Sequence, residues 1–338
     1  MSNLACIWNI ICIFVANFIL NHMSRIEEAL NRLFVQSRGE INSRIEQISF
    51  CVDISGTQAK GYCYCLKVDA NGNLRLKDLI DFIDTKIIEY AIPKKEIDEA
   101  KQYFNDTNSP SKIELLKKKA KGLFTDLEKT GEGGEILLYI LIQEFLQLPQ
   151  LISKMSLKTS GQLHYQGADG IHVKYDASSD CLNLYWAEAK MYQELGSAIT
   201  ECFKSLKGFL LDPQGYGSTQ ERDLQLITSN IQANINDNAL EDLLVRYFDK
   251  DDELSNKVVY KGICFIGFDC NKYPSEGDLS KTTEEIKNAI TTEHQKWYNS
   301  LGDKIKLHTN LDTKEIHVFL MPFPSVAKFR EYYLSTIQ

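Results

Sequence analysis

The sequence predicts an α/β protein in which helices flank a mixed β-sheet. Segments with the apolar spacing of helices alternate along the chain with shorter runs that resemble strands. The segment 257–268 is apolar almost throughout, which is typical of a central strand covered on both faces. Two more strand-like runs, 169–176 and 181–192, are separated by a short polar turn and predict an antiparallel hairpin.

The chain begins with an apolar stretch, Leu4 to Leu20, that has no lysine or arginine before it. A signal peptide would carry that positive charge, and a membrane-spanning helix needs about 20 apolar residues. Three interpretations remain: a translation start placed upstream of a true start at Met23, a membrane anchor, or a buried helix. We favour the first, so we treat residues 1–22 as an uncertain segment. We expect a cytoplasmic protein without a membrane partner.

Residues 23–125 are expected to form an N-terminal α/β region. Turn residues at 69–73 divide its second strand segment, and Pro93 can begin a helix. In chain order, the predicted elements are a helix at 24–47, strands at 48–55 and 60–76, a helix at 78–90, a helix from Pro93 and a basic helix at 111–124.

Residues 126–338 are expected to form the core with its C-terminal elaborations. Gly131 to Gly134 interrupt the chain, and a very apolar helix runs from Glu135 until Pro149 ends it. The remaining predicted elements are a strand at 154–166, the hairpin, helices at 195–210 and 237–248, the central strand, a helix near 283–301, a hairpin at 304–323 and a terminal helix from Ser325.

The bulk composition restricts the possible functions. The formal net charge of −8 argues against unaided binding to polyanions, so a nucleic-acid substrate would need a local basic surface or a partner that delivers it. The nine cysteines are odd in number and show no C-x-x-C or zinc spacing, which favours reduced thiols in the core. No phosphate-binding loop motif occurs, so we expect this chain to bind no nucleotide.

The predicted hairpin brings two carboxylates together at one end. With the turn centred on 178–179, Ile171 faces Trp186 and Asp169 faces Glu188. The Cβ atoms of Asp169 and Glu188 would then stand about 5 Å apart, where like charges repel. A divalent cation that prefers hard oxygen ligands, such as Mg²⁺, would offset this repulsion.

Two more charged residues extend this group. Lys190 lies two residues beyond Glu188 on the same strand face, where its ammonium can stabilise an attacking hydroxide or developing phosphorane charge. Glu135 shares one helix face with Leu138 and Ile142, so its carboxylate is also directed inward. A Glu-x-Lys on a strand is usually a solvated ion pair, and an Asp at a strand start is usually a turn residue. Their combination at matched register favours a catalytic centre.

The order helix-Glu, strand-Asp, strand-Glu-x-Lys, helix resembles the core of the PD-(D/E)XK family of restriction-endonuclease-like nucleases. The resemblance is carried by three motifs: GEILLY beginning at Gly134, GADG beginning at Gly167, and AEAK beginning at Ala187. Ala168 stands where the family name has proline, a residue that supplies no ligand. After Met23 the chain is more narrowly similar to the HamA family, the nuclease subunits of Hachiman anti-phage defence.

The resemblance implies a restriction-endonuclease-like core with an N-terminal α/β extension. It implies a Mg²⁺-dependent DNA endonuclease in which Mn²⁺ substitutes for Mg²⁺. The implied metal ligands are Asp169, Glu188, the carbonyl of Ala189 and Glu135, and Lys190 would orient or stabilise the nucleophile. It also implies a role as defence effector and a helicase partner that restrains the nuclease and senses DNA.

Several features have both a structural and a functional interpretation. A lysine-rich helix is usually a solvated face, but it can also contact phosphates. His172 is expected on the outward face of the hairpin, which favours a surface or second-layer role over metal ligation. The lysines concerned are Lys112, Lys117, Lys118, Lys119 and Lys121, with Lys154 and Lys158 as an extension.

Two rival functions remain open. The chain could be a non-catalytic adaptor or interaction subunit of a nucleic-acid-processing complex, although the presence of all four site residues disfavours it. A membrane-anchored interaction protein is suggested only by the apolar stretch at 4–20.

Overall fold

The computed structural model describes residues 26–36, 38–124, 131–153, 155, 167–211, 218–235, 237–275 and 277–337. The apolar stretch at 4–20 lies outside these residues, as does nearly all of the strand predicted at 154–166. Within the described part of the chain, no helix is both long and apolar enough to cross a membrane.

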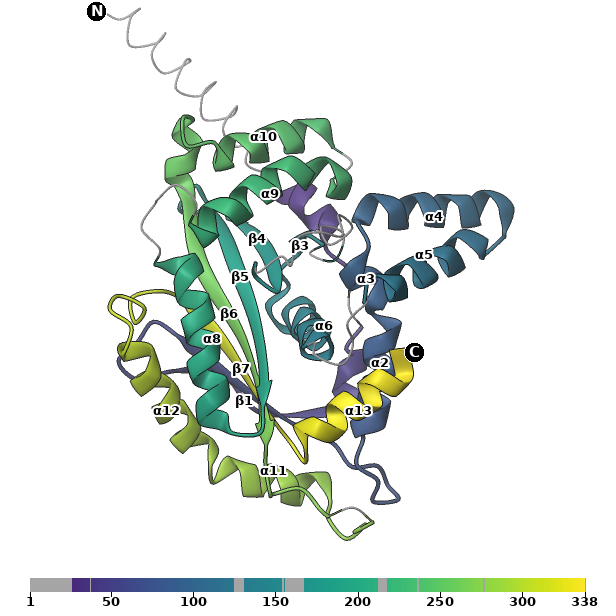
Figure 1. Cartoon of the computed structure of the whole chain (residues 1–338), viewed down its shortest axis with the longest axis vertical. Helices are drawn as coiled ribbons and strands as arrows, with labels where there is room; N and C mark the ends of the chain where they lie inside the picture. Colours follow the sequence, from purple (N-terminus) through teal and green to yellow (C-terminus); the bar gives the residue numbers. More distant parts are fainter. Residues whose placement is uncertain are drawn as a thin grey trace, which may run out of the picture.

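A seven-stranded mixed sheet organises the protein, with the strand order β1-β2-β7-β6-β5-β4-β3 (Figure 1). Strands β2, β7, β6 and β5 are parallel to one another, whereas β1 and β4 run antiparallel to their neighbours. The strands are β1 (Ile45–Asp53), β2 (Lys60–Leu66), β3 (Gln150–Ile152), β4 (Gly170–Asp176), β5 (Cys181–Tyr192), β6 (Val258–Asp269) and β7 (Ile316–Phe323). The predicted central strand is confirmed, because β6 is the fourth strand in the order.

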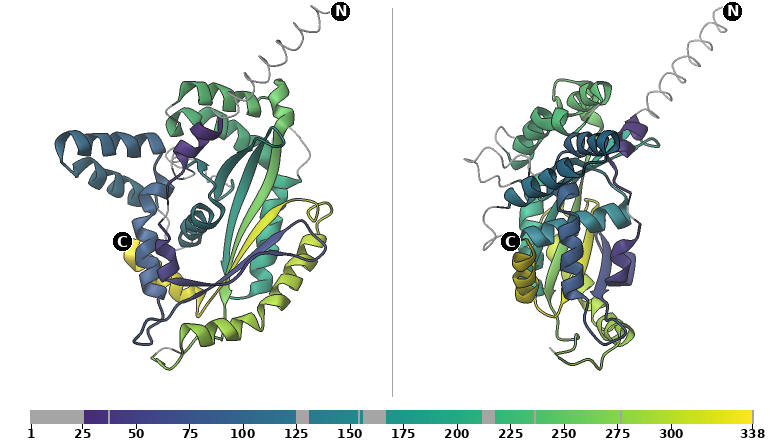
Figure 2. Two further views of the ribbon diagram at one scale, coloured as in Figure 1. Left: turned by 180° about the vertical axis from the view of Figure 1, so that it is seen from behind. Right: turned by 90° about the vertical axis from the view of Figure 1, so that its right-hand side faces the viewer.

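Helices cover both faces of this sheet, which confirms the predicted α/β class. Helices α8 and α12 lie on one side and α6 on the other, while α4 and α5 project from the body as a helical hairpin (Figures 1 and 2). The helices are α2 (Leu76–Thr85), α3 (Ile87–Ala91), α4 (Lys94–Thr107), α5 (Ser111–Gly122), α6 (Glu132–Leu141), α8 (Leu195–Leu210), α9 (Thr219–Asn234), α10 (Asn238–Phe248), α11 (Thr283–Thr291), α12 (His294–Lys306) and α13 (Val326–Ile337).

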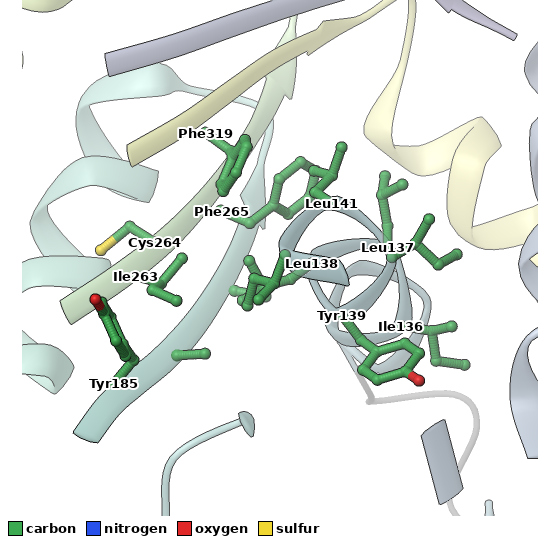
Figure 3. Packing of buried hydrophobic residues seen from close by; sticks show 14 of the residues in the cluster. Ile136, Leu137, Leu138, Tyr139, Leu141, Tyr185, Ile263, Cys264, Phe265 and Phe319 are labelled. Atoms are coloured by element: carbon green, nitrogen blue, oxygen red, sulfur yellow. The ribbon is translucent and has the colours of Figure 1, made fainter. Parts of the chain in front are cut away.

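Alternate residues of the central strands point to opposite helical layers. On one face, Trp186 of β5 stacks on Phe209 of α8, with 5.1 Å between the ring centroids. On the other face, Phe265 of β6 extends towards α6, where its ring lies beside Leu141 (Figure 3). Both faces of the central strands are therefore buried under apolar side chains.

Some predicted elements were wrong. The hairpin predicted at 304–323 does not exist: α12 runs to Lys306, and only β7 is a strand, inserted parallel between β6 and β2. Ile305 keeps helical spacing with Leu301 and packs in the core, so the helix continues past the predicted boundary. The helix predicted at 24–47 ends early. Residues 26–33 are helical, Gly39 has a φ of +73°, and β1 begins at Ile45.

Other boundaries moved without changing the fold. The predicted strand 60–76 ends at Leu66, beyond which one bridge joins Val68 to Leu74 across the turn. The helix predicted near 283–301 is divided into α11 and α12. Helix α9 was not predicted at all.

The N-terminal strands belong to the same sheet as the predicted core. β2 pairs in parallel with β7, from Lys60 opposite His317 to Cys63 opposite Leu320. The ring of Tyr62 stacks on that of Phe319, with 4.8 Å between their centroids. The hydrophobic core is thus continuous across residue 125.

Candidate active site

The site is built around the end of the β4–β5 hairpin. The predicted register is confirmed, since Ile171 pairs with Trp186 and Gly170 with Ala187. The backbone N–H of Asp169 donates a hydrogen bond to the carbonyl of Ala187, with 2.9 Å between N and O. Asp169 therefore stands where β4 begins, directly before its first residue.

Beyond Ala187, the edge of β5 is no longer paired with β4. Its Ala189 N–H instead donates to the Oδ2 atom of Asp169 at 2.9 Å. The N–H and C=O of one strand residue point to the same edge, so the Ala189 carbonyl also faces the side of Asp169. This arrangement places the Asp169 carboxylate and the Ala189 carbonyl on the same side of β5.

Glu188 and Lys190 share the face of β5 that is directed to α8. Their side chains form a buried hydrogen-bonded ion pair, with 4% of the Glu188 side chain and 25% of the Lys190 side chain exposed. Burial alone would lower the pKa of Lys190, but the charges of Glu188 and Asp169 outweigh it and raise that pKa. Lys190 is therefore an ammonium that is paired with Glu188 and also feels the charge of Asp169.

Glu135 approaches from the other face of the sheet. It lies in the first turn of α6, where a Cβ atom on Gly134 would be 3.0 Å from the Met191 sulfur. Glu135 Oε2 accepts a hydrogen bond from the hydroxyl of Tyr90 at 2.8 Å, and the same hydroxyl lies 3.4 Å from the carbonyl oxygen of Asp169. The structure thus brings Asp169, Glu188 and Lys190 together and connects Glu135 to them through Tyr90.

Sequence reasoning missed Tyr90 and Asp223. Tyr90 is fully buried on α3, and burial together with the Glu135 and Asp169 charges raises its pKa, so it stays a donor. Asp223 of α9 is also buried, and its Oδ2 accepts a bond from the Ala168 N–H at 3.2 Å. It thereby supports the backbone directly before Asp169. In the sequence, a tyrosine at the end of an apolar helix face indicates only a core residue, so no signal pointed to Tyr90.

The oxygen donors suit a hard divalent cation, although the side chains do not form a compact ligand set. Asp169 and Glu188 are buried carboxylates, and the Ala189 carbonyl faces Asp169; hard oxygen donors of this kind suit Mg²⁺. Within the described ranges, however, no three His, Cys, Asp or Glu side chains are grouped so that they could hold one ion. Asp169, Glu188 and Ala189 are thus the residues that fit a metal. Glu135, the fourth implied ligand, lies apart from them on α6.

His172 does not lie on the surface, so the outward position predicted for it is wrong. His172 is buried beneath α6, with its Nδ1 atom 3.1 Å from the Leu148 carbonyl oxygen and its ring 6.4 Å from that of Tyr139. Burial lowers the pKa of His172 to about 4. The face predicted to be outward is covered, because the sheet carries helices on both sides. His172 is a neutral core residue.

The lysines of α5 are largely engaged with carboxylates. Lys117 and Lys121 both lie 3.3 Å from oxygens of Asp84, and Lys119 lies 2.6 Å from Glu96. Lys118 is exposed, whereas Lys154 and Lys158 lie outside the described residues. The basic helix is thus partly neutralised by its own neighbours, and contact with nucleic acid remains a prediction.

Comparison with known proteins identifies the family. A search of curated proteins found no match. The family model for HamA matches residues 39–336, which is nearly the whole chain and includes every residue of the candidate site. The chain therefore belongs to the HamA family, a family of Hachiman anti-phage defence proteins.

Proposed function

We propose that this protein is a Mg²⁺-dependent nuclease that hydrolyses DNA phosphodiester bonds as the effector of its defence system. The observation that carries the proposal is the grouping of Asp169, Glu188 and Lys190 where β5 leaves its pairing with β4. Burying a Glu–Lys pair beside a second carboxylate costs free energy of folding. Such groups are therefore better explained by a function than by stability, and they are common at functional sites.

In the proposed reaction, each residue has a separate task. Asp169 and Glu188, with the Ala189 carbonyl, would hold the metal. Glu135, which is hydrogen-bonded to Tyr90, would complete the set of oxygen ligands around it. A bound Mg²⁺ supplies Lewis-acid polarisation of the phosphate and a more acidic water. Lys190 would place its ammonium beside the reacting phosphate and stabilise the negative charge that develops there.

The experiment compares two variants: one removes the positive charge of the pair, and the other removes both charges. Lys190→Met leaves the Glu188 carboxylate buried without its ammonium, which we expect to cost on the order of 3–5 kcal/mol of stability. The double variant Glu188→Gln/Lys190→Met removes both charges and should unfold closer to wild type. We expect both variants to lose cleavage of plasmid DNA in MgCl₂ by at least about a thousandfold. EDTA should abolish wild-type cleavage, and MnCl₂ should restore it.

A matched control is available on α8. Glu201 and Lys204 form an exposed Glu–Lys pair, with 42% and 71% of their side chains exposed. Glu201→Gln/Lys204→Met removes the same charges and should cleave DNA at the wild-type rate. DNA degradation at an undiminished rate by folded Glu188→Gln/Lys190→Met would refute the proposal and favour a non-catalytic adaptor.

The proposal includes a helicase partner that restrains the nuclease. The net charge of −8 supports dependence on a partner for DNA delivery. Assays should therefore be run with the chain alone and with its co-purified partner, because a restrained nuclease would cleave only after release.

A further inference from the structure

We propose that Arg330 binds a phosphate of the DNA backbone next to the reacting group. This inference rests on the proposed nuclease function and deepens it, because it assigns a substrate contact from a helix outside the recognised motifs.

Arg330 reaches the edge of β5 beyond the point where its pairing with β4 ends. Its Nη2 atom donates a hydrogen bond to the carbonyl of Met191, with 2.6 Å between the two atoms. Ala187, Ala189 and Met191 alternate along the strand, so their carbonyls point to one edge. Asp169 meets this edge at Ala189. The guanidinium thus lies about 7 Å along the strand from the Ala189 carbonyl, given about 3.3 Å per residue.

The helix that carries Arg330 is firmly placed. The N–H of Val326, at the start of α13, donates to Oδ1 of Asp269 at 2.6 Å and so fixes α13 to the end of β6. Phe329 and Tyr333 are buried against Gly133 of α6. Arg330, the residue after Phe329, is exposed. Its position relative to the site is therefore set by packed elements rather than by a loop.

The charge and shape of the side chain suit a phosphate. A guanidinium has five N–H donors, and the bond to Met191 uses one of them. The remaining donors form a planar fork that binds phosphate oxygens in a bidentate manner. Asp169, Glu188 and Glu135 make this region acidic, and Lys190 is already paired with Glu188. An exposed cation at this edge would offset the repulsion between these carboxylates and DNA.

The test measures DNA binding in EDTA, where no cleavage occurs. Arg330→Gln removes the charge but keeps a side-chain donor for the Met191 carbonyl, and Arg330→Lys keeps the charge but loses the fork. Lys207→Gln, an exposed position on α8, is the matched control for loss of one charge. A fluorescent duplex is titrated with each full-length protein at several salt concentrations of roughly 50 to 200 mM.

We expect Arg330→Gln to weaken binding about five- to tenfold, equally for duplexes of different sequence, and to reduce the slope of log K against log salt by about 1. Arg330→Lys should fall between Arg330→Gln and wild type, and Lys207→Gln should match wild type. If Arg330→Gln were unstable, Arg330→Lys would carry the test through its loss of affinity alone.

The outcomes separate the two proposals. If Arg330→Gln binds and cleaves DNA like Lys207→Gln while Glu188→Gln/Lys190→Met is inactive, the assignment of Arg330 is overturned and the nuclease proposal stands. If wild type neither binds nor cleaves DNA, alone or with its partner, both proposals fail.

Discussion

At the scale of single residues, the degree of burial distinguishes two ion pairs that are similar in the sequence. Glu188–Lys190 and Glu201–Lys204 both join a glutamate to a nearby lysine. The second pair is largely solvated, and such pairs contribute at most about 1 kcal/mol to stability. The first pair is mostly buried beside Asp169, so removal of one partner leaves an uncompensated charge inside the protein. The sequence predicted that Glu188 and Lys190 share one strand face, because they are two residues apart on one strand.

The remaining site contacts could not be predicted because they join distant parts of the chain. Tyr90 and Glu135 are 45 residues apart, and Arg330 is 139 residues from Met191. The register of a hairpin follows from local alternation and its turn. No comparable local rule relates α3 to α6 or α13 to β5, and their packing depends on the whole fold.

The buried His172 should make folding stability depend on pH. Its pKa of about 4 in the folded protein lies below the ordinary value of 6.5, so the unfolded chain binds more protons between these values. The contribution of neutral His172 to the free energy of unfolding is therefore complete above pH 6.5, and it is lost as the pH falls towards 4. Between about pH 7 and about pH 5 the loss should be about 2 kcal/mol.

The measurement is urea unfolding of wild type and His172→Asn at both pH values. The asparagine amide can replace Nδ1 as a donor to the Leu148 carbonyl, which in wild type is 3.1 Å from Nδ1. We expect the variant to lose about 2 kcal/mol less than wild type on acidification. Equal losses in both proteins would show that His172 is not buried in a neutral form.

At the scale of elements, the glycines at the start of α6 have different tasks. A Cβ atom on Gly133 would lie 2.9 Å from Phe329 and 3.0 Å from Tyr333, whereas a Cβ atom on Gly131 would meet nothing within 4 Å. Gly133→Ala should therefore push α13 away from α6 and cost about 1–3 kcal/mol. Gly131→Ala should change stability by less than about 0.5 kcal/mol.

Thermal and urea unfolding of both variants would check this expectation, with wild type as the reference. Similar stability for Gly133→Ala and Gly131→Ala would contradict the close packing of α13 on α6. DNA binding is a second readout, because α13 carries Arg330. Gly133→Ala should weaken binding, and Gly131→Ala should not.

Element identity was predicted best where the pattern was longest. β6 was identified from its almost continuous apolar run, β5 from the hairpin that it forms with β4, and α8 from its apolar face. β7 was misassigned as half of a hairpin because its parallel partners, β6 and β2, are distant in sequence. The intrinsic pattern of a strand does not specify its neighbour. Helix α9 has a weakly apolar face and carried no clear periodic signal.

At the scale of the whole molecule, the sheet joins the N-terminal region to the segment after residue 125. Removal of residues before 126 would take away β1, β2 and helices α2 to α5. β7 would then lose its pairing with β2, and Phe319 would lose the stacked ring of Tyr62. The site would also lose the Tyr90 hydroxyl that bonds Glu135. The fold is thus expected to be one cooperative unit.

Full-length protein and a fragment of residues 126–338 should behave differently in urea. We expect the full chain to unfold in a single transition, with coincident changes in tryptophan fluorescence and far-ultraviolet circular dichroism. Trp186, fully buried between β5 and α8, reports on the core. The fragment should retain secondary structure but unfold gradually and bind a hydrophobic dye, because the edge of β7 and its aromatic residues are exposed. Addition of a separately produced 23–125 fragment should restore the sharp transition. A fragment that unfolds cooperatively on its own would instead show that the boundary at residue 125 separates two domains, each with its own stable core.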